Sequence, residues 1–436
     1  MNNQKKVLKN FFFNSDFLKK NSFSVYGLGE TGKSATNLFK KKKIKFVAWD
    51  DKLSKKKNKK LFNKSLDESN WILISPGINI EQSRFKNKIL KNKSKIISDL
   101  DLFYILNPKA KSIIVTGSNG KSTTCKIIEH VLKKNNLSVQ LGGNIGKPIL
   151  NLNHKKKSLY IIEASSFQLF YSKFINPKYA IILNITNDHL DWHKTKKNYI
   201  YSKFKVFMNQ NKSDMAFLNN KKLINIYLKK KFKAKLKIVN LKNYMQIKKR
   251  IKNIYLNSLI NDENMSFVYL LMKEFKISLN SFISAVNSFK GLPHRHEIFY
   301  KTSHITFIND SKATSFQATK FALMANKNVY WILGGLPKKN DTFFLQNIKK
   351  KIVKGFIIGK HVNYFKSQLK GKVNFQISYT LDNALNLIFQ EIKTTYRKKI
   401  VVLFSPASAS YDQYNNFNER GDHFKKLVKI YGNKYF

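Results

Sequence analysis

The sequence contains one cysteine, Cys125, so no disulfide bond can form within the chain, and a reducing compartment is expected. Its apolar runs are far shorter than the ~20 residues that span a bilayer. The first residues, MNNQKKVLKNFFFNSDF, lack the apolar core followed by small residues that marks a secretion signal. These absences predict a cytoplasmic protein without membrane insertion.

Acidic residues are scarce: 25 Asp and Glu stand against 82 Lys and Arg, a formal charge of +57. Such a charge raises the question of nucleic acid or an anionic membrane as partner. No recognition helix, zinc-ligand spacing or aromatic RNA platform accompanies it, and abundant Asn, Ile, Phe and Tyr indicate the bias of an AT-rich genome. We therefore expect a solvated lysine surface and no nucleic-acid partner. The lysine runs are 40–45, 55–60, 154–157, 229–237 and 349–351.

The length of 436 residues leaves room for about three domains. Short β-branched runs alternate with longer helix-compatible segments, which predicts an α/β fold of parallel sheets covered by helices. These strand-like runs include 23–29, 45–51, 71–77, 112–117, 159–166, 179–186, 305–311, 329–335, 355–359 and 400–408. Breaks at Pro108 and around Pro293 separate the alternating blocks. The predicted domains are 1–108, 109–293 and 294–436.

The stretch VTGSNGKSTT, residues 115–124, follows one of these strands and opens a helix. Gly117 and Gly120 can form a tight turn whose amides point at phosphate oxygens, with Lys121 supplying positive charge and the helix its positive end. The spacing of the glycines departs from the usual Walker pattern, so the motif alone only suggests a nucleoside triphosphate.

A second glycine loop, GLGETG at 27–32, also follows a strand and opens a helix. Asp50 ends the next strand, about 20 residues further on, as in a dinucleotide fold. This pattern is compatible with NAD, but the same cradle of amides would hold the diphosphate of any nucleotide-linked substrate. The residues alone leave both readings open.

Polar side chains follow two strands of the middle block. Glu163 ends the strand 159–163, and Asp188, His189 and Asp191 come just after the next one. Ligands of α/β proteins bind at the carboxyl ends of parallel strands, so a carboxylate and an imidazole there could meet Mg²⁺ beside the phosphate loop. In the last block, the Ser, Thr and Asp residues of 307–318 and 403–421 are better explained by helix capping when their chemistry alone is considered.

Twelve short blocks, in order over nearly the whole chain, resemble the Mur ligase family. They are GLGETG, SPGI, TGSNGKST, GNIGKP, EASSFQL, NDHLDWH, YIYSKFKVF, NDEN, GLPHRHE, NDSKAT, LGGLPK and SPASASYDQYNNFNERG. The resemblance implies a Rossmann-like N-terminal domain that binds the UDP of the substrate without NAD, a central P-loop ATPase domain with a mostly parallel sheet, and a Rossmann-like C-terminal domain. The activity it implies is ATP-dependent amide formation in peptidoglycan precursor synthesis.

Within the family, the last block is similar to the ligases that add D-glutamate to UDP-N-acetylmuramoyl-L-alanine through an acyl phosphate, giving ADP and phosphate. A monomeric enzyme acting on these small molecules is therefore expected. Another ligase of the family, or one of the folylpolyglutamate type with a different amino acid, remains the alternative. The family's DNPR signature for diaminopimelate is absent.

Site residues are implied by matching the family motifs position by position. The ATP site would comprise Gly117, Ser118, Asn119, Gly120, Lys121, Ser122, Thr123, Asn261, Asn264, Arg295, Asp310 and Lys312. The UDP-substrate site would comprise Gly27, Leu28, Gly29, Glu30, Thr31, Gly32, Asp50, Gly77, Asn144, Ser165 and Gln168. The D-glutamate site would comprise Thr314, Lys338, Ser410, Tyr411 and Phe417.

The catalytic residues implied are Lys121, Glu163, His189 and Lys203, with two Mg²⁺ ions as cofactors. Ser122, Glu163, His189 and Lys203 would hold the metal, because the family carbamylates the lysine that Lys203 matches. Carbamylation turns a cationic amine into an anionic oxygen ligand. The sequence departs from the family pattern at Ala164, Ile260, Ser315 and Ser408, which affects local geometry rather than the reaction.

Overall fold

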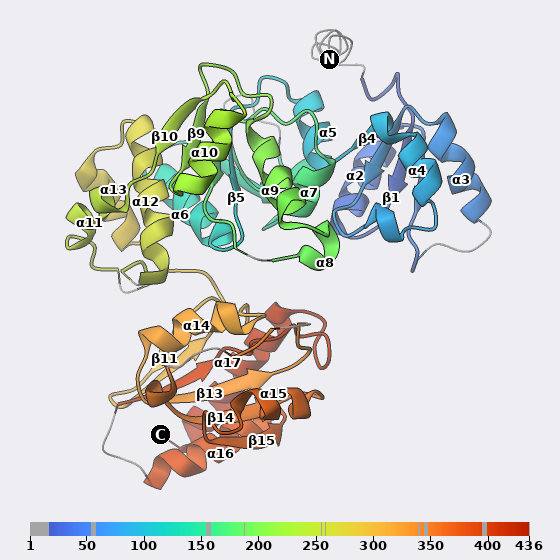
Figure 1. Cartoon of the computed structure of the whole chain (residues 1–436). Helices are drawn as coiled ribbons and strands as arrows, with labels where there is room; N and C mark the ends of the chain where they lie inside the picture. The colour runs from blue at the N-terminus through green and yellow to red at the C-terminus, as the bar shows by residue number, and fades with distance from the viewer. Residues whose placement is uncertain are drawn as a thin grey trace. The chain divides into compact units, whose positions relative to one another are not determined.

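The computed structural model describes residues 17–53, 58–153, 158–186, 188–253, 255–257, 259–338, 341–343, 348–394 and 399–435. Within them, three parallel or mostly parallel sheets carry helices on their faces, which confirms the predicted α/β class (Figure 1). The chain forms two compact units, Met1–Lys252 with Asp262–Phe289, and Asn253–Asn261 with Lys290–Phe436. Residues 1–16, on which we based the absence of a signal, and the lysine run 154–157 lie outside the described residues.

The first sheet has the strand order β2-β1-β3-β4, and its neighbouring strands are parallel. Its strands are β1 (Phe23–Tyr26), β2 (Phe46–Trp49), β3 (Trp71–Ile74) and β4 (Ile96–Ile97). Its helices are α2 (Glu30–Lys41), α3 (Lys59–Glu68), α4 (Lys86–Lys91) and α5 (Asp99–Leu106). Side chains of α2 pack with one face of the sheet and those of α3 and α4 with the other, so both faces are buried.

The second sheet has six parallel strands in the order β10-β9-β8-β5-β7-β6. They are β5 (Ser112–Thr116), β6 (Val139–Gly143), β7 (Leu159–Glu163), β8 (Tyr179–Ile182), β9 (Met215–Leu218) and β10 (Lys235–Ile238). The helices are α6 (Lys121–Lys134), α7 (Ser166–Tyr171), α8 (Leu190–His193), α9 (Lys196–Phe204), α10 (Lys221–Lys229), α11 (Leu241–Lys248), α12 (Leu259–Glu274) and α13 (Leu279–Asn287). The buried β5, at the centre of the sheet, leads directly into the phosphate loop.

The first two sheets share one hydrophobic core, to which β1, α2, α5 and the strands β5, β7, β8 and β9 all contribute side chains. Phe103 of α5 is fully buried in it and packs edge-on against Tyr160 of β7, with ring centroids 5.1 Å apart. Ser34 of α2 also donates a hydrogen bond of 2.7 Å to Asn151. This common core explains why both sheets fall in one compact unit; the boundary at 108 stays a prediction.

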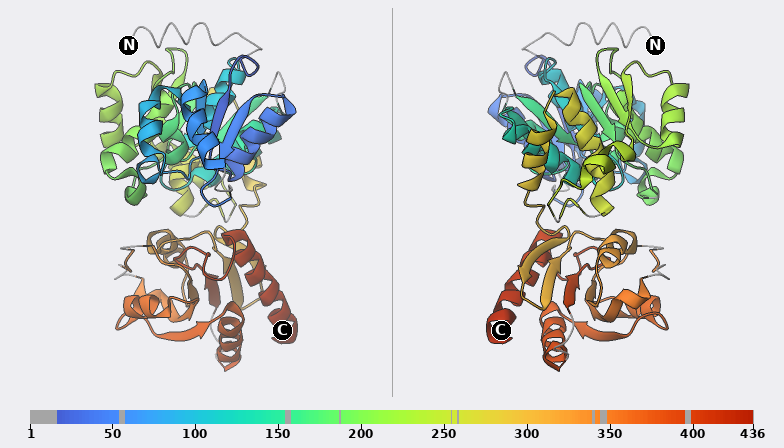
Figure 2. Two further views of the ribbon diagram at one scale, coloured as in Figure 1. Left: turned by 90° about the vertical axis from the view of Figure 1, so that its right-hand side faces the viewer. Right: turned by 90° about the vertical axis from the view of Figure 1, so that its left-hand side faces the viewer.

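The third sheet has the order β11-β12-β16-β13-β14-β15, and its edge strand β11 is antiparallel to β12. Its strands are β11 (Glu297–Lys301), β12 (Ile305–Asn309), β13 (Val329–Gly334), β14 (Ile352–Ile358), β15 (Phe375–Tyr379) and β16 (Ile400–Phe404). Its helices are α14 (Phe316–Ala325), α15 (Val362–Leu369), α16 (Leu381–Thr394) and α17 (Phe417–Tyr435). As Figure 2 shows, α14 and α15 cover one face, and α16 and α17 cover the other.

The strand β10 overlaps the lysine run 229–237, which the sequence analysis assigned to a solvated surface. It pairs with β9 on one side and forms the edge of the second sheet, with Lys235 and Ile238 exposed. Lysines on an edge strand hinder pairing with another chain, so a strand with this composition carries little apolar signal. No helix in the described part of the chain is long and apolar enough to cross a membrane.

We predict that Phe103→Ala lowers the free energy of unfolding by about 3–5 kcal/mol, because it leaves a cavity in the core shared by two sheets. Urea unfolding followed by circular dichroism measures the change. Leu61→Ala, at a 57% exposed position on α3, should change stability by less than about 0.5 kcal/mol. Equal effects of the two substitutions would contradict a shared core at Phe103.

Candidate functional site

The phosphate loop joins β5 to α6 and depends on two glycines with positive φ. Gly117 has φ +155° and Gly120 has φ +84°, values that side-chain-bearing residues rarely adopt. A Cβ at Gly120 would lie 2.1 Å from Oδ1 of Asn264, so α12 packs tightly against the turn. The N-cap residue of α6 is Gly120, so no N-cap side chain accepts from the first amides of this helix.

Two lysines converge on the carbonyl oxygen of Gly117. Lys121 donates to it at 2.8 Å and also to the carbonyl of Ser118 at 2.8 Å, while Lys203 donates to it at 2.9 Å. The side chain of Lys203, on α9, is almost fully buried at 1% exposure. Burial, followed by the charge of Lys121, holds the pKa of Lys203 well below its usual range. One buried amine with a tendency to be neutral therefore lies beside a cationic one.

Glu163 ends β7 in the register position beside Val115 of β5, one strand away from the phosphate loop. Its side chain is 2% exposed, and Oε1 accepts a hydrogen bond of 2.8 Å from Nδ2 of Asn144. The other oxygen, Oε2, is buried and has no hydrogen-bond partner among the described residues. A buried carboxylate oxygen without a donor is costly, and a bound cation or donor would satisfy it.

His189 lies in the segment after β8, in the left-handed conformation with φ +54°. Its Nε2 is 3.3 Å from Oδ2 of Asp188, and its ring packs on Phe167 with centroids 4.6 Å apart. Tyr199 of α9 links this segment to the loop: its hydroxyl is 2.8 Å from Oγ of Ser118, and its ring lies 6.4 Å from that of His189. In the described part of the chain, no three His, Cys, Asp or Glu side chains group closely enough to hold a metal by themselves.

Ser165 and Gln168, predicted to contact the UDP-linked substrate, form a capping box at the start of α7. Ser165 Oγ accepts from the amide of Gln168 at 3.2 Å, and Gln168 Oε1 accepts from the amide of Ser165 at 3.1 Å. Gln168 Nε2 also donates to the buried Asp99 at 3.1 Å. These side chains therefore have a structural role in α7, and their contact with substrate stays a prediction.

The first glycine loop is held by its neighbours in the first sheet. A Cβ at Gly32 would lie 1.8 Å from the carbonyl oxygen of Gly27, which also accepts a 2.8 Å hydrogen bond from Ser75. Asp50 accepts from the amide of Leu28 at 2.7 Å. Partial burial alone would raise the pKa of Asp50, but backbone hydrogen bonds, first from Leu28, hold it below its ordinary value. Asp50 thus fixes the loop, which also contains the predicted residues Gly29, Glu30 and Thr31. The predicted Gly77 follows β3.

In the C-terminal unit, Asp310 follows β12 and accepts hydrogen bonds from Oγ of Ser405 at 2.7 Å and from the amide of His296 at 3.1 Å. Desolvation raises its pKa to about 7. The ammonium of Lys312 lies over the ring of Phe417, 3.6 Å from its centroid, in a cation–π contact. Two residues predicted for ATP and one predicted for D-glutamate therefore flank the carboxyl end of β12.

The turns that follow β13 and β16 are paired through backbone hydrogen bonds between Leu336 and Ala409, at 3.0 and 2.9 Å. This pairing places the segment that carries Lys338 next to the segment that carries Ser410 and Tyr411. Lys338 and Tyr411 are exposed, whereas Ser410 is buried. Four of the predicted D-glutamate residues, Lys338, Ser410, Tyr411 and Phe417, thus follow adjacent strands, and Thr314 follows β12.

Residues 115–288 match the model of the Mur ligase middle domain. The UDP-N-acetylmuramoylalanine–D-glutamate ligase of Wolbachia pipientis wMel is 30% identical, covering 94% of this chain and 97% of its own. Those of Rickettsia felis and Aquifex aeolicus are 33% and 32% identical over 94% of this chain, covering 97% and 99% of their own. The chain belongs to the Mur ligase family.

Solved structures agree with this family in fold. The MurF ligase from Thermotoga maritima, in complex with ADP, superposes with a TM-score of 0.58 at 15% identity, covering 96% of this chain and 97% of its own. The UDP-N-acetylmuramate-alanine ligase from the same organism gives a TM-score of 0.54 at 15% identity over 95% of this chain and 100% of its own. The predicted three-domain Mur ligase fold is therefore confirmed.

The sequence analysis of this Mur ligase missed Arg420, whose side chain is 1% exposed at the start of α17. Its guanidinium donates to Oγ and the carbonyl of Ser311, at 3.1 and 2.8 Å, and to the carbonyl of Ser408, at 3.0 Å. It therefore joins the turns after β12 and β16. Arginine in the first turn of a helix carries no signal for such a role, because both partners are distant in sequence.

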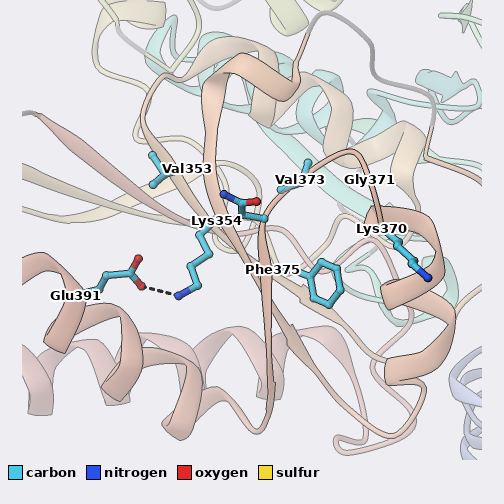
Figure 3. A pocket seen from close by; sticks show the side chains of 8 residues that line it. Val353, Lys354, Lys370, Gly371, Val373, Phe375 and Glu391 are labelled. Carbon is cyan, nitrogen blue, oxygen red and sulfur yellow. Dashed lines mark hydrogen bonds and ion pairs between the residues drawn. The ribbon is translucent and has the colours of Figure 1, made fainter.

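Figure 3 shows a pocket of about 610 Å³ in the C-terminal unit, where Lys354 and Glu391 form an ion pair with a 3.0 Å separation. It lies at the amino ends of β14 and β15, near Lys370 and Phe375. None of the predicted binding residues of this Mur ligase lines this pocket, and those that follow strands lie at the opposite, carboxyl ends.

We predict that Arg420→Met lowers the free energy of unfolding by about 3 kcal/mol or more, because buried acceptors on Ser311 and Ser408 lose their donor. Lys426→Met, at an exposed position on the same helix, is the matched control and should be close to neutral. Chemical denaturation of the full chain measures both. Similar stabilities for the two variants would show that Arg420 does not hold these turns.

Proposed function

We propose that this Mur ligase uses ATP to join D-glutamate to UDP-N-acetylmuramoyl-L-alanine, releasing ADP and phosphate. The proposal rests on the arrangement of the phosphate loop. Lys121 and Lys203 both donate to the carbonyl of Gly117, and the buried Glu163 ends the neighbouring strand. The names of the full-length relatives support the choice of substrates.

The reaction must bring together two anions, the alanyl carboxylate and the triphosphate. The carboxylate attacks the γ-phosphorus, an acyl phosphate forms as ADP leaves, and the amine of D-glutamate then displaces phosphate. Lys121 offsets the charge on the phosphates, and the amides of the loop hold them in place. Positioning and charge compensation therefore supply most of the catalysis.

The residues fit a divalent cation, because Oε2 of Glu163 is a buried acceptor without a partner in the described residues. We assign Ser122, Glu163, His189 and a carbamylated Lys203 as the groups that would hold Mg²⁺, with two ions in all. When bound, Mg²⁺ neutralises charge on the phosphates and on the transferring group.

Lys203 suits carbamylation, since burial and the charge of Lys121 favour its neutral amine. The lone pair of Nζ adds to CO₂ and a proton is released, which leaves an anionic carbamate. An anion at this position would also relieve the repulsion between the two lysines at Gly117. We therefore assign Lys203 a negative charge, as the carbamate, in place of the positive charge of its ammonium form.

The remaining assignments follow the family motifs. The first glycine loop with Asp50 and Gly77 binds UDP, and Asn144, Ser165 and Gln168 contact the muramoyl-alanine part. Asn261, Asn264, Arg295, Asp310 and Lys312 belong to the ATP site, and the residues after β12, β13 and β16 hold D-glutamate. Pairing of Lys338 with a carboxylate would favour an acidic amino acid. We further propose a cytoplasmic monomer that acts on small molecules.

The test is phosphate release from ATP in the presence of the UDP-linked substrate and one amino acid at a time. We expect release to require both the UDP-linked substrate and D-glutamate. Release with another amino acid, or with a folate in place of the UDP-linked substrate, would favour the alternative specificity. FolC of Escherichia coli has a similar fold, with a TM-score of 0.53 at 13% identity over 80% of this chain.

We predict that Lys121→Ala lowers the rate of acyl-phosphate formation by about 10³-fold or more, because charge on the phosphates is no longer offset. Binding of the UDP-linked substrate, measured by calorimetry, should stay largely intact. Lys126→Ala is the control, since Lys126 lies on the same helix and pairs with Glu129 at 2.9 Å. Full ligase activity of Lys121→Ala would refute the role of the phosphate loop.

We predict that Lys203→Ala is inactive and regains part of its turnover when a short-chain carboxylate such as acetate is added, because the added anion replaces the carbamate. Lys205→Ala is the control: Lys205 is partly buried, with a pKa lowered to about 8 by desolvation, but it bonds to the carbonyl of Phe170. If Lys205→Ala lowers the turnover, adding acetate should not restore it. Normal turnover of Lys203→Ala at low Mg²⁺ would contradict the carbamate.

A further inference from the structure

The amides of the phosphate loop are held by Asn184, two residues past the end of β8. Its backbone carbonyl accepts from the amide of Ser118 at 2.8 Å, and its Oδ1 accepts from the amide of Asn119 at 2.9 Å. Its Nδ2 donates back to the carbonyl of Asn119 at 3.3 Å. Asn184 therefore fixes two successive residues of the loop, Ser118 through its backbone and Asn119 through its side chain, and the orientation of its side-chain amide decides whether Oδ1 can accept from Asn119.

The orientation of Asn184 is set by Glu263 on α12. Nδ2 of Asn184 donates to Oε2 of Glu263 at 2.9 Å, and Nδ2 of Asn219 donates to Oε1 at 2.7 Å. Asn219 comes directly after β9, so the carboxylate bridges the carboxyl ends of two neighbouring strands. A carboxylate accepts at both oxygens and donates at neither, so it allows one orientation of each asparagine amide.

The same helix contacts the next residue of the loop. Asn264, adjacent to Glu263, packs so closely on Gly120 that a Cβ there would lie 2.1 Å from its Oδ1. Two consecutive residues of α12 thus act on two consecutive residues of the loop, Asn119 through Asn184 and Gly120 directly. The sequence analysis selected Asn261 and Asn264 from this segment but not Glu263, which lies between them.

We propose that Glu263 is a positioning residue for the nucleotide: through the side chain of Asn184 it presets Asn119 of the phosphate loop before the nucleotide binds. It touches neither the phosphates nor the reacting atoms. The proposal rests on the proposed function in that the loop binds ATP. A preset loop pays less ordering entropy on binding, so loss of Glu263 should appear first in nucleotide affinity.

Glu263→Gln is the sharpest change, because glutamine has nearly the same shape but presents one acceptor and one donor. At least one of the two asparagine amides must then turn over or face another donor. We expect affinity for ADP, measured by calorimetry with the full chain, to fall about tenfold. The KM for ATP should rise by a similar factor, with smaller effects on kcat and on the KM for D-glutamate.

Glu274→Gln is the matched control, because Glu274 lies on the same helix and pairs with Lys237 at 2.6 Å, outside the loop network. It should bind ADP like the parent chain. Asn219→Ala should weaken ADP binding less than Glu263→Gln, since it leaves the bond to Asn184 in place, and the two changes together should be less than additive.

A role of Glu263 in general stability would act differently. It would lower the unfolding midpoint and all KM values together, whereas a positioning role raises the KM for ATP selectively and leaves affinity for the UDP-linked substrate unchanged. Equal ADP affinity of Glu263→Gln and Glu274→Gln would overturn the inference. If the parent chain itself did not bind ADP, the proposed function would fail instead, so the two failures are distinguishable.

Discussion

The structure around the middle sheet depends on one crowded oxygen, the carbonyl of Gly117, which accepts hydrogen bonds from Lys121 and Lys203. Two ammonium groups that share a buried acceptor repel each other strongly. The pKa of Lys203 is lowered first by its burial and then by the charge of Lys121. Parallel pairing of β5 with β7 and β8 then brings an unsatisfied carboxylate oxygen of Glu163 and the segment of His189 to the same edge of the sheet. Two lysine side chains and a buried carboxylate oxygen that has no donor among the described residues thus lie at this edge, which suits a polyanion bound with a cation.

The two glycine loops have the same strand–turn–helix design but different chemistry. In the first loop, the amide of Leu28 is already bonded to Asp50, and no lysine enters the turn. In the second, Asn184 fixes the loop while Lys121 brings a positive charge into it. A triphosphate about to lose its γ-phosphoryl group needs that charge, whereas a diphosphate that is only held does not. The sequence pattern of the first loop left NAD and another nucleotide open; family membership, rather than loop geometry, is the ground on which we propose UDP.

Local patterns predicted the central strands and the residues at their ends, because buried parallel strands are apolar throughout and their carboxyl ends collect polar groups. They did not predict β10, whose lysines conceal an edge strand, or the antiparallel β11. Local patterns did not identify Glu263 and Arg420 either. Asn184, a partner of Glu263, lies 79 residues away in the chain, and Ser311, a partner of Arg420, lies 109 residues away. The capping box of Ser165 and Gln168 shows the opposite case: a local rule explains both residues without any ligand.

The lysine surplus can be understood from where the cations lie. Lysines of the run 40–43 are exposed, and each change there alters little beyond net charge. Lys203 and Arg420 are about 1% exposed, and each has defined backbone acceptors that a different side chain would leave unsatisfied. A genome bias toward lysine can therefore accumulate on the surface while the buried cations stay tied to their partners. Composition describes the first set, and only the tertiary contacts identify the second.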